Sequence, residues 1–541
     1  MWRQEDPQGN ESAKVRFDLV PYMHGRILDL GCGVQKVFPI AIGIDNRIDA
    51  KLFGIEVKPD IAVDSCERMP WLADDAADAT FSSHLLEHIA DYQAALKEWW
   101  RVTKTDGHLI LYLPNNEDAV ESGGYPKMGE HGANPDHKWD VSYERVVEAM
   151  KSVGSWDLVE FEKRNQGQEY SLLFVFRKTA EGQRFSYRDP KPVQKTLGIV
   201  RLGAYGDALW ISGLLPKYKA EGYHITVYTQ PQGEEVLRYD PNIDRIICQP
   251  IGLFDFADGR VAMWQTAYWL HEEKKYDRFI NMIGSTERRL LPQPFDPDFY
   301  LPFEQRHRMM NRNYIEALHE WVGVTFVKAS SKQKFYPNAE ELSWAAQERA
   351  KIDGPLIIIN PAGSSAPKWW PYTQELADML ATERIHSIIV GDLRFHKLRP
   401  SRFSRVVGTE WPIRRVFALA AMADAVVGTE SAVVNAVAYE EPLKVVLLSH
   451  STHENLTRDW HNTISLEPEG LKCYPCHRIH ADMSNCSYDR ETQSASCQAA
   501  AKAELVFERI RAYLAARENV APVSAYNTVA SAMMRRAARA T

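Results

Sequence analysis

Short apolar runs alternate with amphipathic helical patterns in three successive stretches of this chain. In the first stretch, runs typical of strands fall at 26–30, 40–44, 79–82, 109–113 and 172–177. The later two stretches have such runs at 197–202, 225–228, 245–247 and 278–281, then at 355–360, 387–391, 406–408, 425–428 and 443–449. This alternation is typical of parallel sheets, because each parallel connection needs a crossover that a helix usually provides. The sequence therefore predicts an α/β protein with three Rossmann-like units.

Domain boundaries follow from the same pattern. A chain of 541 residues is too long for one ordinary hydrophobic core. The segment KTAEGQRFSYRDPKPVQK, from Lys178 to Lys195, is hydrophilic and contains two prolines, which is typical of a linker. We expect a first domain at 1–178, a linker at 179–195, two halves of a second domain at 196–345 and 346–515, and a flexible tail at 516–541.

Composition excludes several classes of protein. The net charge of −8 and the absence of a basic cluster argue against nucleic acid as a partner. The first ten residues are polar, and no apolar run reaches 18 residues, so we expect neither a signal peptide nor a transmembrane segment. A cytoplasmic protein is predicted, and peripheral contact with a membrane is compatible with it.

The first chemical signal is the sequence Asp29-Leu30-Gly31-Cys32-Gly33 at the end of a predicted strand. Gly31 and Gly33 have no Cβ, so the backbone there can approach a ligand closely. Asp45 ends the next predicted strand, where an acid in nucleotide-binding α/β folds accepts hydrogen bonds from ribose hydroxyls.

Two further segments continue this series of strand ends. Asp64, followed by Ser65, suits the exocyclic amine of adenine, and Ser83 opens the stretch that leads to His88. Over roughly residues 20–178, these four motifs in this order resemble the class I S-adenosylmethionine-dependent methyltransferases. The resemblance implies that S-adenosylmethionine is the cofactor and that Asp29, Gly31, Gly33, Asp45, Asp64, Ser65 and Ser83 bind it.

The spacing departs from the usual pattern at one point. Only 11 residues separate Gly33 from Asp45, and Pro39 lies among them. Dinucleotide-binding folds allow about 20. We therefore expect the first helix to be short or absent.

The sequence excludes some classes of methyl acceptor. The segment Ser82-Ser83-His84 stands where enzymes that methylate DNA bases carry their own motifs, so a hydroxyl of a sugar or another small acceptor fits better. Such a reaction needs a base, and His88, His131 and His137 are candidates, with His88 preferred. Each of them has the alternative of being a surface histidine without a catalytic role.

The second chemical signal is Arg201-Leu202-Gly203-Ala204-Tyr205-Gly206-Asp207, where a predicted strand turns into a helix. The positive end of a helix keeps an acid ionised, so Asp207 should carry a charge near neutral pH. An ionised carboxylate beside Gly203 and Gly206 can accept a proton from an attacking hydroxyl. The alternative is that Asp207 only caps the helix.

Two later loops offer binding sites for anions. The loop from Asn360 to Pro371 contains small residues and one lysine, Lys368, which supplies a point charge for phosphate. A second loop, Gly428-Thr429-Glu430-Ser431-Ala432, joins a predicted strand to a helix.

Together these three motifs, over about residues 196–515, resemble the lipopolysaccharide heptosyltransferases, inverting enzymes of the GT-B architecture that use ADP-heptose. The resemblance implies that Asp207 is the general base and that Lys368, Ser364 and Ser365 contact the nucleotide diphosphate. Its other implied donor-binding residues are Gly203, Gly206, Asp392, Thr429, Glu430 and Ser431, with Asp392 a loose match to the family's acidic residue.

The late loop departs from the family pattern. Glu430 and Ala432 stand where the family has Asn or Asp and then glycine, two residues later. Alanine narrows the space for backbone approach, so the donor is expected to be a nucleotide-diphosphate sugar, with an ADP-heptose-like donor and a different sugar nucleotide as open alternatives. No divalent metal is required by this arrangement.

Four of the seven cysteines fall close together near the end of the chain: Cys473, Cys476, Cys486 and Cys497. A Cys-x2-Cys pair is one half of a common zinc site, although the second half is badly spaced here. Zinc binding, a disulfide and free thiols are the three alternatives.

These observations predict a bifunctional transferase that acts in the synthesis of a glycan or the modification of another polymer. It would transfer a sugar with inversion from a nucleotide-diphosphate donor and methylate a sugar or related hydroxyl. One alternative is a non-catalytic scaffold that binds carbohydrate or nucleotide and is built from decayed transferase domains. Modification of nucleic-acid bases is the other.

Overall fold

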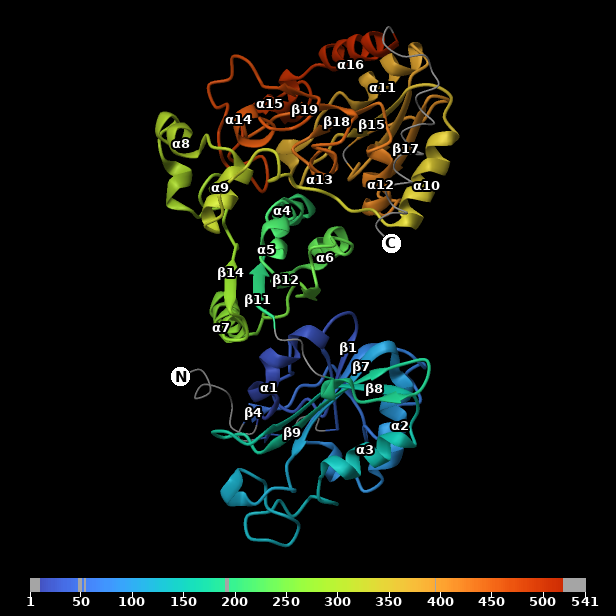
Figure 1. The fold of residues 1–541 in the computed structure, drawn as a ribbon, viewed down its shortest axis with the longest axis vertical. Helices are drawn as coiled ribbons and strands as arrows, with labels where there is room; N and C mark the ends of the chain where they lie inside the picture. The colour runs from blue at the N-terminus through green and yellow to red at the C-terminus, as the bar shows by residue number, and fades with distance from the viewer. Residues whose placement is uncertain (1–9, 47–50, 53–54, 190–193, 395, 519–541) are drawn as a thin grey trace. The chain divides into compact units, whose positions relative to one another are not determined.

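The computed structural model describes residues 10–46, 51–52, 55–189, 194–394 and 396–518 (Figure 1). The chain forms two compact units. Unit 1 comprises residues 1–194 and 247–277, and unit 2 comprises residues 195–246 and 278–541.

Unit 1 is built on an eight-stranded sheet with the order β10-β8-β9-β7-β6-β1-β2-β5. Neighbouring strands are parallel from β5 to β7, and β9 runs antiparallel to both β7 and β8. The strands are β1 (Ile27–Leu30), β2 (Ile42–Asp45), β5 (Ile61–Ala62), β6 (Ala77–Ser83), β7 (Thr103–Pro114), β8 (Trp156–Arg164), β9 (Ser171–Lys178) and β10 (Gln183–Arg184). The short strands β3 (Lys51–Leu52) and β4 (Ile55–Glu56) pair with each other.

Helices α2 and α3 of unit 1 pack apolar residues into one core with the strands of this sheet. Trp99 from α2 is fully buried with Leu111 of β7 and Phe174 of β9 in the core. The helices are α1 (Ser12–Leu19), α2 (Tyr92–Val102), α3 (Tyr143–Lys151) and α7 (Val261–Glu273), with the 3₁₀ turns η3 (Leu86–His88) and η5 (Ser186–Arg188) among the shorter elements. No helix lies between β1 and β2 over 31–41, which confirms the prediction that the first helix is short or absent.

Residues 247–277 group with unit 1 although the sequence suggests no such association. Phe17 of α1 packs against Trp264, Tyr268 and His271 of α7, with ring centroids 5.6 to 6.4 Å apart. Asp18 accepts a hydrogen bond from Lys275 at 3.0 Å. These contacts join segments more than 240 positions apart, which no local sequence pattern reports.

Unit 2 contains two parallel sheets. The first has the order β13-β12-β11-β14, and the second has the order β17-β16-β15-β18-β19-β20. The strands are β11 (Thr196–Val200), β12 (His224–Thr229), β13 (Arg245–Cys248), β14 (Arg278–Asn281), β15 (Leu356–Asn360), β16 (His386–Val390), β17 (Ser404–Gly408), β18 (Ala425–Thr429), β19 (Leu443–Leu447) and β20 (Thr463–Leu466). The predicted fold class is thereby confirmed as α/β with Rossmann-like parallel sheets.

Helices connect and cover the sheets of unit 2. They are α4 (Tyr205–Ile211), α5 (Leu215–Ala220), α6 (Pro231–Leu237), α8 (Phe303–Met310), α9 (Tyr314–Trp321), α10 (Ala339–Ala350), α11 (Thr373–Thr382), α12 (Ile413–Ala420), α13 (Ala432–Ala436), α14 (His453–Leu456), α15 (Ser496–Ala500) and α16 (Ala503–Glu518). Trp210 of α4 donates to Oδ1 of Asn435 on α13 at 2.8 Å, which ties the first sheet's helices to those of the second. The pair is buried, and residues from both halves of unit 2 share one hydrophobic core around it.

The predicted linker and tail differ in extent from the structure. Residues 183–188 form β10 and η5, because Phe185 packs edge-on against Trp156, with centroids 5.1 Å apart. The linker is therefore shorter than predicted, and residues 190–193 within it lie outside the described residues. Helix α16 continues to Glu518, and the rest of the predicted tail, 519–541, also lies outside them. Within the described part of the chain, no helix has the length and apolar character needed to cross a membrane.

Candidate active sites

The carboxyl ends of β1, β2 and β6 lie side by side in unit 1. In the parallel register Leu30 of β1 pairs with Ile44 of β2 and with Ser82 of β6. The turn after β1 uses Gly31, with φ +70°, and an added Cβ there would lie 2.9 Å from the Leu85 side chain. Glycine is therefore required at position 31 by both conformation and space.

Asp45 lies at this edge in contact with the glycine turn. Its Oδ2 atom accepts a hydrogen bond from the Gly33 amide at 2.9 Å. The structure thus brings together two of the predicted cofactor-binding residues. The contact holds the turn against the end of β2, the position at which ribose hydroxyls bind in related folds.

Asp29 is placed differently from the other predicted cofactor residues. Its side chain is buried, with 2% of the residue exposed, and Oδ2 accepts a hydrogen bond from the Val37 amide at 2.7 Å. Burial raises the pKa of Asp29 to about 7. The carboxylate anchors the helix-free loop 31–41 from beneath.

The remaining predicted cofactor residues differ in exposure. Asp64 and Ser65 are exposed, and the Val63 amide donates to the carbonyl of Asp45 at 3.0 Å, which keeps this segment beside the end of β2. The hydroxyl of Ser83, at the end of β6, is buried without a hydrogen-bond partner among the described residues. A polar ligand atom could satisfy such a group.

Three side chains with metal-ligand chemistry meet just after β6. One ligand atom each from Glu87, His88 and His137 lies within 4.8 Å of the others. His137 is buried, and this burial lowers its pKa to about 4. Burial raises the pKa of Glu87 to about 8. The third candidate base, His131, is exposed on the loop before His137.

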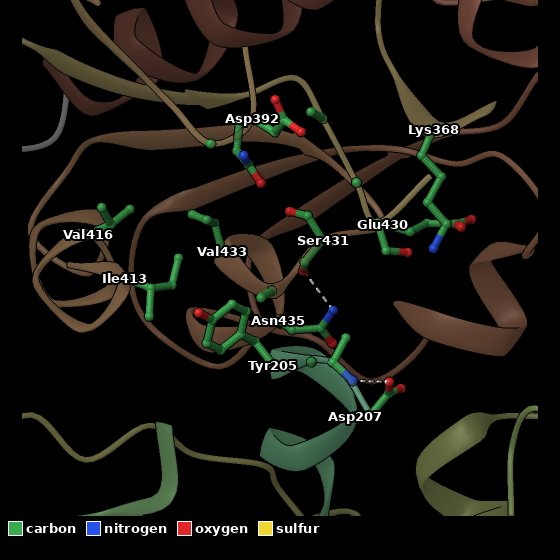
Figure 2. Close-up of a pocket in the computed structure, with 18 of the residues that line it drawn as sticks. Tyr205, Asp207, Lys368, Asp392, Ile413, Val416, Glu430, Ser431, Val433 and Asn435 are labelled. Carbon is green, nitrogen blue, oxygen red and sulfur yellow. Dashed lines mark hydrogen bonds between the residues drawn. The ribbon is translucent and has the colours of Figure 1, made fainter. Parts of the chain in front are cut away.

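Unit 2 contains a pocket of about 540 Å³ lined from both of its halves (Figure 2). A volume of this size suits a nucleotide-sized ligand. The pocket brings together seven predicted residues: Gly206, Asp207, Ser364, Lys368, Asp392, Glu430 and Ser431. The other three predicted donor-site residues, Gly203, Ser365 and Thr429, are near neighbours of these in sequence but do not line it.

Asp207 points into this pocket from the start of α4. Its side chain is 25% exposed, and its Oδ1 atom lies 3.2 Å from Nη2 of the buried Arg201. Oδ2 accepts a hydrogen bond from the Ala204 amide at 2.9 Å. Burial raises the pKa of Asp207 above its ordinary value, while the charge of Arg201 offsets part of this effect. A carboxylate with a raised pKa is a stronger base toward a hydroxyl.

Lys368 enters the pocket from the opposite half of unit 2. Its stem packs over Gly363, where an added Cβ would lie 2.6 Å from the lysine Cδ. Among the described residues, its ammonium has no hydrogen-bond or ion-pair partner within 4 Å, so it is available to a ligand. Ser364 beside it is exposed within the pocket.

Glu430 is already engaged by protein groups. Oε1 accepts hydrogen bonds from the amides of Ser449 and Ser451 at 2.9 and 3.1 Å, and Oε2 lies 2.6 Å from Nδ1 of His450. Burial alone would raise the pKa of Glu430, but His450, Lys368 and these hydrogen bonds lower it to about 2. The glutamate thus presents a fixed negative charge near Lys368.

Hydroxyl groups without partners lie next to Glu430. The side-chain oxygens of Thr429 and Ser431 are buried and have no hydrogen-bond partner among the described residues. Ser431 lines the pocket, and its carbonyl accepts a hydrogen bond from Asn435 at 2.8 Å. Ser431 therefore offers a hydroxyl to an anionic ligand.

The far end of the pocket is apolar. Ile413, Val416 and Val433 line it, and Figure 2 shows Ile413 and Val416 on the side away from Lys368. Asp392 also lines the pocket, and its ion pair with Arg394, at 2.6 Å, lowers its pKa. An apolar end beside a cationic end suits a nucleobase joined to phosphates.

The four clustered cysteines are reduced in the structure. Among the described residues, only Glu87, His88 and His137 bring three candidate metal ligands within 4.8 Å of one another. The cysteines therefore do not form such a group here, although Sγ of Cys476 lies 3.7 Å from Nε2 of His480. A zinc site at Cys473, Cys476, Cys486 and Cys497 stays a prediction.

Comparison with known proteins agrees with the geometry of unit 1. Residues 28–111 match the family model described as "Methyltransferase domain". Residues 28–111 form a methyltransferase domain. The match covers β1, the glycine turn, Asp45 and the Glu87–His88 pair, and it places the chain among the transferases.

Similar solved structures fall into two groups. E. coli ADP-heptose lipopolysaccharide heptosyltransferase II is 16% identical, covers 60% of this chain and 99% of its own, and has a TM-score of 0.41. A glycosyl transferase family 9 protein from Veillonella parvula is 14% identical, covers 59% and 97%, and has a TM-score of 0.39. A methyltransferase from Thermotoga maritima, described as a possible histamine N-methyltransferase, is 18% identical, covers 31% and 89%, and has a TM-score of 0.24. A search of curated protein sequences found no match.

Several residues of these sites were not found by sequence reasoning. Glu287 pairs with Arg201 beside Asp207, and His450 pairs with Glu430, yet both partners come from distant loops. The one sequence feature that could have pointed to Glu87 is its position next to His88 inside the methyltransferase segment. No local pattern marks Glu287 or His450.

Proposed function

We propose that the chain is a bifunctional transferase that joins a glycosyl group and a methyl group to hydroxyl acceptors. The observation that carries the glycosyl part is the pocket that Asp207 and Lys368 share, whose far end is apolar. The methyltransferase domain at residues 28–111 supports the second activity. The likeness of the sequence motifs to heptosyltransferases supports a nucleotide-diphosphate sugar as donor.

In the proposed glycosyl transfer, Asp207 accepts the proton of the acceptor hydroxyl as its oxygen attacks the anomeric carbon. The bond between that carbon and the diphosphate breaks, and the configuration inverts. Lys368 and the hydroxyl of Ser431 would stabilise the negative charge that builds up on the departing diphosphate. Ile413 and Val416 would hold the base of the nucleotide and so fix the donor in the pocket.

The side chains that line the donor pocket are suited to binding a diphosphate. Lys368 and Ser431 both line it, and the Ser431 hydroxyl has no hydrogen-bond partner among the described residues. Glu430 keeps a negative charge next to Lys368, which limits non-specific anion binding and favours ligands that make several contacts.

For the methylation, the end of the unit 1 sheet would hold S-adenosylmethionine. When bound there, this cofactor supplies the methyl group of its sulfonium. Asp45 would accept hydrogen bonds from the ribose, and Asp64 would lie near the adenine amine. The acceptor hydroxyl would lie near the Glu87–His88–His137 cluster, where His88 would accept its proton as the methyl group is transferred.

Both activities are proposed to act on one glycan or a related polymer. Placing the two units in one chain raises the effective concentration of the product of one reaction at the other. Both donors are metabolites of the cytoplasm, so we propose that the enzyme works there.

A panel of nucleotide sugars tests the glycosyl transfer. Release of nucleoside diphosphate with one donor is expected from the wild type, together with a loss of at least 100-fold in Asp207→Asn. Retained nucleotide binding without turnover for any donor and acceptor would instead favour a non-catalytic scaffold.

Calorimetry with S-adenosylmethionine tests the other unit. Binding is expected in the wild type and should fall at least tenfold in Asp45→Ala, which removes the carboxylate next to Gly33. Asp136→Ala, on an exposed loop of the same unit, is the control. A wild type that does not bind the cofactor would contradict the methylation proposal.

A further inference from the structure

A buried carboxylate in unit 1 lacks the partners that its burial demands. Glu87 is fully buried, and neither of its side-chain oxygens has a hydrogen-bond partner among the described residues. An isolated carboxylate in a protein interior is costly unless a cation or several donors compensate for its charge.

Three imidazole nitrogens lie near Oε1 of this carboxylate. Nε2 of His88 and Nε2 of His137 each lie 3.9 Å from Oε1 of Glu87, and Nδ1 of His84 lies 3.6 Å away. These separations exceed hydrogen-bonding distance. The rings of His88 and His137 have centroids 4.8 Å apart and are nearly perpendicular, at 86°. The nitrogens thus face a common point next to the glutamate oxygen.

The backbone holds this cluster together across 50 positions of sequence. The Lys138 amide donates to the carbonyl of Glu87 at 2.8 Å, and Nε1 of Trp139 donates to the carbonyl of Leu86 at 3.1 Å. Trp139 is also stacked on Tyr92, with centroids 4.1 Å apart. His137 is therefore held against η3 by its two following residues.

We propose that Glu87, His88 and His137 bind a divalent first-row transition metal ion such as Zn²⁺ or Mn²⁺. Two imidazoles and one carboxylate are a common ligand set for such ions and leave coordination positions for a substrate. Ligand atoms around tetrahedral zinc lie about 3.3 Å apart. The separations between the three ligand atoms, now up to 4.8 Å, would therefore need to shorten by up to about 1.5 Å.

The neighbourhood of the cluster suits a metal. The side chain of His88 is 27% exposed, which provides a route for an ion from solvent. Nε2 of His84 shares a hydrogen bond with the Ser171 hydroxyl at 3.0 Å. Nδ1 of the same ring lies 3.6 Å from Oε1 of Glu87, where it could serve as a further nitrogen ligand to the metal. The metal ion would supply the positive charge that compensates for the buried carboxylate of Glu87.

The site has a consequence that rests on the proposed methylation. An acceptor hydroxyl bound to the ion would lose its proton to solvent water more readily, because the metal stabilises the resulting alkoxide. His88 would then act as a metal ligand and not as the base. Methylation would depend on added metal, whereas binding of S-adenosylmethionine at Asp45 would not.

Cobalt binding to the full-length chain tests the site. The metal-free protein is titrated with Co²⁺, whose visible absorption reports nitrogen and oxygen ligands and whose thiolate bands report any binding at the clustered cysteines. We expect a stoichiometric visible signal without thiolate bands, and at least tenfold weaker binding in Glu87→Gln and in His88→Gln. His131→Gln, an exposed histidine of the same loop, should bind as the wild type does.

Two results would overturn the metal site. One is a wild type that shows thiolate bands alone, and the other is a Glu87→Gln variant that retains wild-type affinity. Because Glu87 is buried, thermal unfolding of each metal-free variant checks that it folds, and the partly exposed His88 provides the second variant. Metal binding without any binding of S-adenosylmethionine would refute the methylation proposal and leave the metal site standing.

Discussion

Arg201 shares its guanidinium between Asp207 and Glu287. Its Nη2 atom lies 3.2 Å from Oδ1 of Asp207 and 2.8 Å from Oε1 of Glu287, and its side chain is only 1% exposed. The pair with Glu287 is bidentate, since Nη1 also donates to Oε2 at 3.1 Å. One buried cation thus orients the proposed base while a second acid competes for its charge.

Glu287→Gln should extend glycosyl transfer to lower pH. Asp207 must be deprotonated to act as a base, so activity falls as the pH drops through its pKa. The negative charge of Glu287 raises that pKa. Without this charge, Arg201 pairs with Asp207 only, so the pKa of Asp207 falls. The acid limb of kcat/KM against pH should therefore move to lower pH. Glu235→Gln, which also lines the pocket, is the control; an unmoved limb in Glu287→Gln would exclude this coupling.

Asp29→Asn should stabilise unit 1 at neutral and alkaline pH. Burial raises the pKa of Asp29 from 3.8 to about 7, so the folded state holds a proton that the unfolded state releases. The wild type should therefore lose about 4 kcal/mol of stability as the pH rises from about 4 to about 7. The variant lacks this loss, and its Oδ1 can still accept the hydrogen bond from Val37.

Calorimetric unfolding at pH 5 and pH 8 checks the Asp29 prediction. The stability difference between the variant and the wild type should be larger at the higher pH. A difference that is the same at both values would mean that Asp29 does not titrate in this range.

Lys368→Met should weaken nucleotide binding. The ammonium is proposed to contact the diphosphate, and the loss of a charge-assisted contact costs roughly 1.5–3 kcal/mol, or about ten- to 100-fold in Kd. Lys351→Met is the matched control, because Lys351 lies in the same half of unit 2 and pairs with Glu348 at the surface. Calorimetry with nucleoside diphosphates measures both; equal affinities would remove Lys368 from the donor site.

The sequence predicted the parts of this protein that depend on local pattern. Strands such as β1 and β15 were found from apolar runs, and the absent helix before Asp45 followed from the short spacing and Pro39. Parallel sheets bring their carboxyl ends to one edge, so residues at strand ends could be expected to meet. Lys368 and Ser431 follow neighbouring strands of one sheet and line one pocket in this way, whereas Asp207 enters the same pocket from the other sheet of unit 2.

Contacts between distant segments could not be predicted in this way. The association of α7 with α1 depends on Phe17 and Trp264, which carry no shared local signal. Sequence reasoning also predicted that Glu430 binds the sugar donor. It could not reveal that the carboxylate of Glu430 is already paired with Ser449 and His450. Such partners are fixed by tertiary packing, so they emerge only when the strands are assembled.

Gly203→Ala should slow glycosyl transfer while nucleotide binding is retained. Gly203 has φ +130°, and an added Cβ would lie 2.8 Å from Oδ2 of Asp207. Alanine would therefore push the proposed base away from its hydrogen bond with Ala204. A displacement of about 1 Å can cost roughly 100-fold in rate, so kcat should fall by that order. The donor contacts at Lys368 lie in the other half of unit 2 and should be unaffected.

Gly222→Ala provides the control for backbone strain alone. Gly222 has φ +83° in the same half of unit 2, and an added Cβ there would meet nothing within 4 Å. This variant should lose stability, because alanine is disfavoured at positive φ, but it should keep its kcat. Equal loss of kcat in both variants would trace the effect to general destabilisation. A loss confined to Gly203→Ala would tie the rate to the position of the Asp207 carboxylate.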